Sequence, residues 1–465
     1  MKQITTIIAS LLFSIIFFQQ NVGLNLLLFT SITIAFLIIS VRQKVLKKRT
    51  LLLAFAYIIS GVLVFVHNSG LSIITNCALF FSLIGSISEH KTSVYVKWLN
   101  GIYTSIAGTL QRNFETDNDT ENVNKKTNID ALHLTKLIAI PLVFITIFVL
   151  LYKNGNPVFN DLVSKISFEF INLQWILFTV LGYFLFSNIS KPMVVEPATT
   201  LDLKTGNELF KTETFSEDKL KKEKQLGTTL LGLLNVLLVF FIVTDIMSLM
   251  TMDTSKASEL SDLVHSGINT LIASILIAIA IILYFFRGNL NFYSENRILK
   301  HLTFIWIALN IMLIVLIAIK NQNYITSFGL TYKRIGVHIY IFLTLVGLIT
   351  TLLKVLNIKN LVFLFRKNTQ IAFATLVILS TVNWDNIITN YNLSQASSYD
   401  IGYLIDLSDR NAILLHDKKD DVEISTHNRN RIITKYSRHI KNLESQNWQE
   451  LTFEKLTFDK NHNTY

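Results

Sequence analysis

Residues 23–49 read GLNLLLFTSITIAFLIISVRQKVLKKR, an uncharged apolar run followed at once by five Lys and Arg residues. The run from 23 to 41 is long enough to cross the roughly 30 Å hydrocarbon layer of a bilayer as an α-helix. A cluster of basic residues beside such a helix is typical of the cytoplasmic side of a membrane. With an earlier apolar run at 4–18, this stretch predicts two membrane spans and an N-terminus in the cytoplasm.

The composition of the whole chain agrees with a membrane protein. Of 465 residues, 51% are hydrophobic and 16% charged, and the mean hydropathy is +0.45; soluble domains carry about 25% charged residues. The net charge of +10 is spread over several loops rather than gathered in one patch, which argues against a nucleic-acid partner. A single cysteine, Cys77, excludes an intramolecular disulfide.

The fold class predicted from these patterns is all-α: a polytopic transmembrane helical bundle of about 11 spans (10–12), with a small, mostly helical C-terminal tail outside the membrane. The expected spans are residues 4–18, 23–41, 51–67, 70–88, 135–152, 173–190, 226–249, 267–286, 301–320, 335–355 and 368–382. Residues 94–110 contain Lys97 and Asn100, so we expect an interfacial or re-entrant segment there rather than a span. The transmembrane domain is thus 1–382, and the tail is 383–465.

Loop charges give the predicted orientation in the bacterial cytoplasmic membrane. With 94–110 not crossing, the polar loop 191–225 and the loops at 287–300 and 354–367 face the cytoplasm, whereas residues 113–128 of the polar loop 111–134 are expected to be flexible. The tail then lies outside the cytoplasm. Three basic residues on the outer side oppose this arrangement: Lys320, Lys333 and Arg334.

Four polar side chains within or beside the spans are candidates for function, because polar groups are costly in hydrocarbon. Asp245 could bind a proton or a cation, or simply reach the lipid headgroups. Asn235 and Asn310 lie in mid-span, where an amide either lines a polar path or bonds to a neighbouring helix. His265 opens a span beside an acidic loop, as an interfacial residue or as a proton site.

Motifs of soluble enzymes are missing from the sequence. It contains no phosphate-binding glycine loop, no His-Glu-x-x-His, no Gly-x-Ser-x-Gly and no dinucleotide fingerprint. We therefore assign no catalytic residue, no metal ligand and no cofactor, and an enzyme is disfavoured.

Several segments resemble an uncharacterised family of bacterial polytopic membrane proteins, a domain of unknown function. Near the start, Gly23-Leu24-Asn25-Leu26 resembles the entry of that family's second helix. The most specific piece is Phe328-Gly329-Leu330-Thr331 followed by Arg334. The tail adds Asn383, Asp385, Tyr391-Asn392, Asp400, Tyr403-Leu404 and Asn447-Trp448. The resemblance implies a multi-pass membrane protein and no particular activity. Physically, Gly329 permits a tight turn, and Arg334 is suited to anchoring at headgroups.

Three functions remain open from the sequence. The bundle either moves a small solute, as a transporter or channel, or acts in signalling or as a scaffold through its tail. A membrane-embedded enzyme acting on lipid or envelope precursors is the third hypothesis. The expected partners are the lipid bilayer and a protein bound by the tail, and the oligomeric state is left open.

Overall fold

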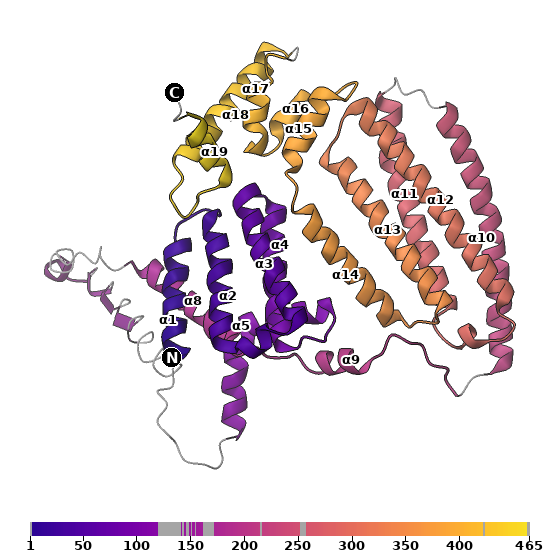
Figure 1. Cartoon of the computed structure of the whole chain (residues 1–465), viewed down its shortest axis with the longest axis horizontal. Coiled ribbons are helices and arrows are strands. Elements are labelled where there is room, and N and C mark those ends of the chain that lie inside the picture. Colours follow the sequence, from indigo (N-terminus) through magenta and orange to yellow (C-terminus); the bar gives the residue numbers. More distant parts are fainter. Residues whose placement is uncertain are drawn as a thin grey trace.

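The computed structural model describes residues 2–119, 172–213, 216–251, 257–421 and 424–462, with short pieces between 141 and 160. Its described residues are mainly helical (Figure 1). The longer helices are α1 (Lys2–Phe17), α2 (Leu24–Val45), α3 (Lys48–His67), α4 (Gly70–Ser88), α5 (Val94–Asp119), α8 (Leu173–Ile189), α10 (Glu217–Thr251), α11 (Ala257–Phe285), α12 (Arg297–Phe328), α13 (Tyr332–Leu356) and α14 (Leu361–Leu379). Shorter elements are α9 (Ala198–Lys204), η2 (Asn289–Phe292), α15 (Trp384–Ser394), α16 (Ile401–Asp406), η3 (Asp409–Asn411), α17 (Ala412–Asp417), α18 (Thr426–Glu444) and α19 (Phe453–His462).

The long helices form two bundles, each with its own apolar core. One core joins α1 to α4 with α8, and the other joins α10 to α13 (Figure 1). Helix α14 packs on α13 and also reaches the first bundle, where the Phe373 ring meets Trp98 of α5 edge-on at 5.3 Å between centroids. Helix α14 therefore packs against both bundles.

The outer surfaces of both bundles are apolar, as expected where the surroundings are lipid. Large side chains such as Leu52, Val236 and Phe240 are 68–70% exposed on α3 and α10. Among the described residues, seven helices are long and apolar enough to cross a membrane, and shorter apolar helices cover Gln3–Phe17, Leu173–Ile189 and Thr270–Phe285. The chain is thus a multi-pass, all-α membrane protein. The eleven-span count remains a prediction, because 135–152 lies mostly outside the described residues.

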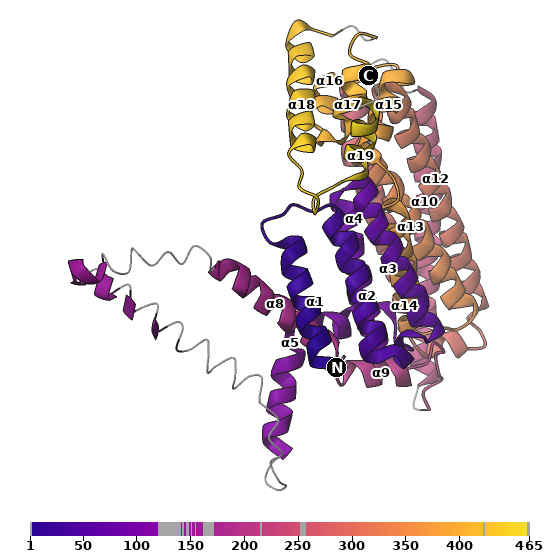
Figure 2. The same cartoon turned by 60° about the vertical axis from the view of Figure 1, so that its left-hand side comes forward.

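The two ends of the bundles differ in what they carry. Helix α9 and the N-terminus lie at one end, and α15 to α19 lie at the other (Figures 1 and 2). Helix α5 begins at the α9 end and packs closely on the end of α4, since a Cβ on Gly85 would lie 1.9 Å from the Lys97 carbonyl oxygen. Segment 94–110 is not among the seven long apolar helices. Its interfacial role remains a prediction.

Several helices run further than hydropathy predicts. Helix α10 begins at Glu217, within the predicted polar loop 191–225, and α5 extends to Asp119, within the loop 111–134. Once a helix is nucleated, each added residue gains one backbone hydrogen bond, so it continues beyond the apolar run. Hydropathy therefore marks the part of a helix that lipid surrounds better than it marks the ends of the helix.

The tail folds around a buried lysine. The apolar positions of 399–415 have roughly helical spacing, and the structure has α16, η3 and α17 there. Lys435 of α18 is 4% exposed, and its Nζ donates to the carbonyl oxygens of Ile405 and Leu407 at 2.9 Å and to Asn411 Oδ1 at 2.7 Å. These bonds satisfy carbonyls that the break between α16 and α17 leaves without helical partners.

Burial lowers the pKa of Lys435 from 10.5 to about 8. Between these two values the unfolded tail binds a proton that the folded tail has released, so the tail gains stability as the pH rises. We predict that pulse proteolysis of the full chain in lipid nanodiscs finds a more resistant tail at pH 9.5 than at pH 7.5. Lys435→Met should remove this gain, whereas Lys441→Met, at an exposed position of the same helix, should keep it. A tail that weakens over this range would contradict the assignment.

Candidate functional site

A buried carboxylate holds the tail to the second bundle. Asp385, in the first turn of α15, is fully buried. Its Oδ2 accepts hydrogen bonds from Arg410 Nε at 3.0 Å, from Arg410 Nη2 at 2.8 Å and from the Ser408 hydroxyl. Its Oδ1 accepts one from the Tyr332 hydroxyl at 2.6 Å. Since the arginine compensates the charge and hydroxyls complete the hydrogen bonding, this carboxylate is satisfied without water.

The loop between α12 and α13 is held by the tail through its backbone. Asn392 of α15 accepts a hydrogen bond from the Leu330 N–H at 2.5 Å and donates one to the Leu330 carbonyl at 2.9 Å. Gly329 ends α12 with a φ of +82°, and a Cβ there would lie 2.3 Å from Asn392 Oδ1. The residue must therefore be glycine for conformation and for space. Tyr391 is half-buried, and its carbonyl accepts the Gln395 N–H at the end of α15.

Arg334 stiffens the same loop. It donates to the carbonyl oxygens of Phe328, at 2.7 Å, and Gly329, and its guanidinium stacks on the Tyr324 ring at 3.8 Å. The Thr331 side chain caps α13 by accepting the Arg334 N–H. The sequence predicts that Arg334 anchors to lipid headgroups; in the structure its guanidinium bonds to the carbonyls that end α12. We call this loop, with Asn392 and the Asp385 cluster, the tail junction.

The first bundle contacts the tail through a second backbone pairing. The N–H groups of Leu24 and Asn25 donate at 2.8 Å to the carbonyls of Leu451 and Gln449. A Cβ on Gly23 would lie 2.2 Å from the Glu450 carbonyl oxygen, so this pairing also requires glycine. The segments that carry the family resemblance, far apart in the sequence, thus meet at one end of the molecule.

A polar pocket of about 330 Å³ separates the α3–α4 turn from the tail. His67 and Asn68 line one side, and Arg410, His439 and Glu454 line the other. His439 Nε2 lies 3.2 Å from Glu454 Oε1. Within the described part of the chain, no group of three His, Cys, Asp or Glu side chains is placed to hold a metal ion. The polar lining and the contact between His439 and Glu454 make this a polar, ionic pocket.

The four candidates inside the spans do not form one site. Asp245 of α10 pairs with Lys320 of α12, and their side chains are 9% and 17% exposed. Asn235 donates to the Leu302 carbonyl of α12 at 3.0 Å, and Asn310 donates to the Trp306 carbonyl of its own helix at 2.7 Å. His265 belongs to α11, and its side chain lies outside the described ones. Asp245, Asn235 and Asn310 line neither the polar pocket nor the groove described below.

Sequence reasoning missed two ionic features at the opposite end. Asp202 of α9 accepts hydrogen bonds from Arg366 of α14 and from the Ser93 N–H at 2.7 Å. Burial acts to raise the pKa of this carboxyl, but the hydrogen bonds from Ser93 and Arg366 outweigh it and lower the pKa. Lys354 of α13 is fully buried and donates to the Phe286 carbonyl at 2.6 Å. No spacing motif marks such contacts between distant segments.

The fold and the junction define the class: an integral membrane protein of two helix bundles joined by a helical tail. The family model described as "Domain of unknown function (DUF4153)" matches residues 7–417. The chain therefore belongs to this family, which confirms the resemblance to an uncharacterised family. No curated protein and no solved structure matches the chain.

The amide pair at Asn392 gives a direct prediction. Asn392→Ala leaves the N–H and the carbonyl of Leu330 without their partner, at a cost of about 1–3 kcal/mol. We expect faster hydrogen exchange of the amides of residues 329–334 in the full chain, with α2 to α4 unchanged. Asn390→Ala, at an exposed position of the same helix, is the control. Equal exchange in both variants would show that the amide does not hold the loop.

Proposed function

We propose that the protein acts in membrane signalling or as a membrane scaffold, through its C-terminal tail and without catalysis. The observation that supports this most is that the tail is folded and held by both bundles at once. Its core, with Ile388, Leu404 and Ile432, includes Ile335 of α13. On its other side, α19 lies against α3, with Phe65 and Phe453 in edge-to-face contact. If one bundle moved relative to the other, the tail would therefore have to move or become strained.

We further propose eleven spans in a bacterial cytoplasmic membrane, with the N-terminus in the cytoplasm and the tail outside. Supporting this, the N-terminus and α9 lie opposite the tail (Figure 2). Two of the three basic residues that oppose the orientation are compensated locally: Lys320 by Asp245, and Arg334 by carbonyl oxygens. Orientation follows the number of Lys and Arg residues rather than net charge, so the proposal rests on the more numerous basic residues of the loops at 191–225, 287–300 and 354–367. Lys333, the third, has no partner among the described residues.

Solute transport has less support. A transport path needs polar groups that converge on water. The Asp245 carboxylate of α10 instead faces the Lys320 ammonium of the neighbouring helix α12. The Asn235 and Asn310 amides donate to backbone carbonyls, which is how amides hold helices together in lipid. These contacts favour packing roles.

Complementation of a strain that lacks the gene separates the two functions without knowledge of a substrate. The readout is the set of transcripts that distinguishes this strain from its parent. We expect Asp385→Asn and Asn392→Ala, which disturb the tail junction, to fail to restore the parental profile. The double variant Asp245→Asn/Lys320→Gln, which removes both charges of the pair, should restore it. Each variant is first shown to reach the membrane at the parental level.

The reverse pattern would overturn the proposal. If the junction variants restored the profile and the double variant did not, the ion pair within the bundle would carry the function, as transport requires. Asn390→Ala, at an exposed site in α15, serves as the tail control and is expected to restore the profile.

A further inference from the structure

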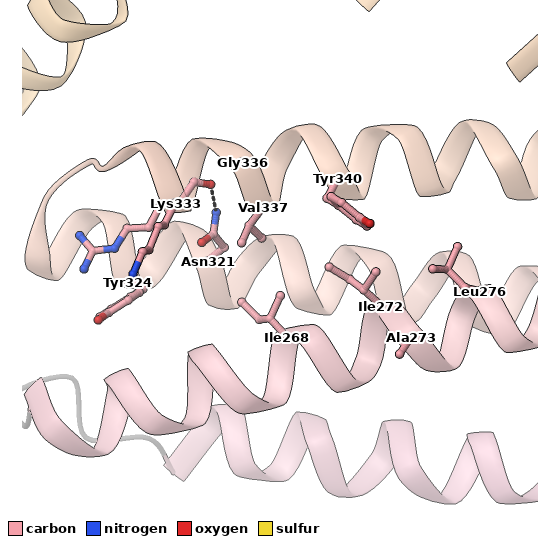
Figure 3. A pocket seen from close by; sticks show the side chains of 11 residues that line it. Ile268, Ile272, Ala273, Leu276, Asn321, Tyr324, Lys333, Gly336, Val337 and Tyr340 are labelled. Atoms are coloured by element: carbon pink, nitrogen blue, oxygen red, sulfur yellow. Dashed lines mark hydrogen bonds between the residues drawn. The ribbon is translucent and has the colours of Figure 1, made fainter. Parts of the chain in front are cut away.

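A groove of about 430 Å³ opens beside the tail junction, between α11, α12 and α13. Figure 3 shows Ile268, Ile272 and Leu276 of α11 facing Val337 and Tyr340 of α13. Leu276 is 48% exposed and Tyr340 is 55% exposed, so the groove is open at the lipid-facing surface. From Ile268 to Leu276 a helix rises about 12 Å, which is most of one ~15 Å leaflet. The groove therefore has the direction and depth of an acyl chain.

One end of the groove is cationic. Lys333 and Arg334 line it there, and no Asp or Glu is among its lining residues. Arg334 is tied to backbone carbonyls, whereas Lys333 has no hydrogen-bond or ion-pair partner among the described residues. Figure 3 places Lys333 beside Tyr324, away from Leu276. An ammonium at the membrane surface above an apolar groove is complementary to a phosphate that carries an acyl chain.

Gly336 leaves space for such a chain. It lies on α13 between Lys333 and Tyr340, and a Cβ built on it meets no atom within 4 Å. The groove is thus not filled by side chains at this point. A glycine in the middle of a helix costs roughly 0.5–1 kcal/mol relative to alanine, and no turn or close helix contact requires one here.

We propose that this groove binds an acidic phospholipid from the leaflet on the tail side, with its phosphate at Lys333 and one acyl chain along α11 and α13. A neutral or zwitterionic lipid would fill the apolar part but gain less from the Lys333 ammonium. A soluble phosphate would gain the Lys333 ammonium but leave the apolar walls of the groove uncovered.

Native mass spectrometry of the purified full chain tests the proposal, with phosphatidylglycerol and phosphatidylethanolamine of identical acyl chains as probes. For the first lipid bound, we expect a preference for phosphatidylglycerol of about fivefold or more, the effect of one cation near an acidic headgroup. Lys333→Gln should reduce this preference to less than twofold. Lys441→Gln, which removes an exposed lysine of the tail, should leave it unchanged.

Steric variants separate the groove from general lipid adhesion. Gly336→Leu and, from the opposite wall, Ala273→Phe should weaken binding of the first phosphatidylglycerol at least fivefold. Gly232→Leu on α10 is the matched control, because a Cβ there also meets no atom within 4 Å. Unchanged binding in both groove variants would overturn the proposal. So would glycerol phosphate that competes as well as the whole lipid, since the site would then be one for free phosphate.

Discussion

The arrangement at the tail end depends on the buried carboxylate of Asp385. An ionised group without water must be compensated, and here the compensation comes from Arg410 and Ser408 of the tail and from Tyr332 at the start of α13. The ion pair therefore orders the tail itself, and the bond from the Tyr332 hydroxyl links the same carboxylate to the second bundle. The Asn392 amide adds a directional bond to the backbone of the loop that ends α12. These directional hydrogen bonds form only when the tail is placed in one way. They therefore specify how the tail docks on the bundle, which apolar contact alone would not do.

The two bundles are joined at both ends by contacts of different kinds. At the tail end, residues 449–451 pair with the start of α2 while α15 holds the α12–α13 loop. At the opposite end, Arg366 of α14 binds Asp202 of α9. Between them, α14 packs on both bundles. Because the tail contacts both bundles, its position depends on how the bundles lie relative to one another. The proposed lipid groove lies beside the same α12–α13 loop.

The sequence predicts the spans well where uncharged runs have sharp limits. The expected spans 70–88 and 173–190 match α4 and α8 within one residue. It fails where a charge lies inside a helix, as at Arg366 of α14, because its partner Asp202 is far away in the chain. The contacts of the tail junction are also hidden in the sequence. Gly329, Arg334 and Asn392 stand out as motif residues, yet their spacing does not show that they meet. The polar residues within the spans, more conspicuous in the sequence, are not brought together.

The most direct test of the account is whether the tail lies against the first bundle in native membranes. The Leu24 N–H donates to the Leu451 carbonyl at 2.8 Å, and residues paired through their backbones have Cα atoms about 5.5 Å apart, within the range that a disulfide spans, so cysteines at these two positions, with Cys77→Ser, are placed to form a disulfide. A protease site at the exposed Phe210 then cuts the chain between them. If the tail is docked, oxidised halves stay together on a non-reducing gel and separate on reduction. Halves that separate even after oxidation would contradict the docked tail.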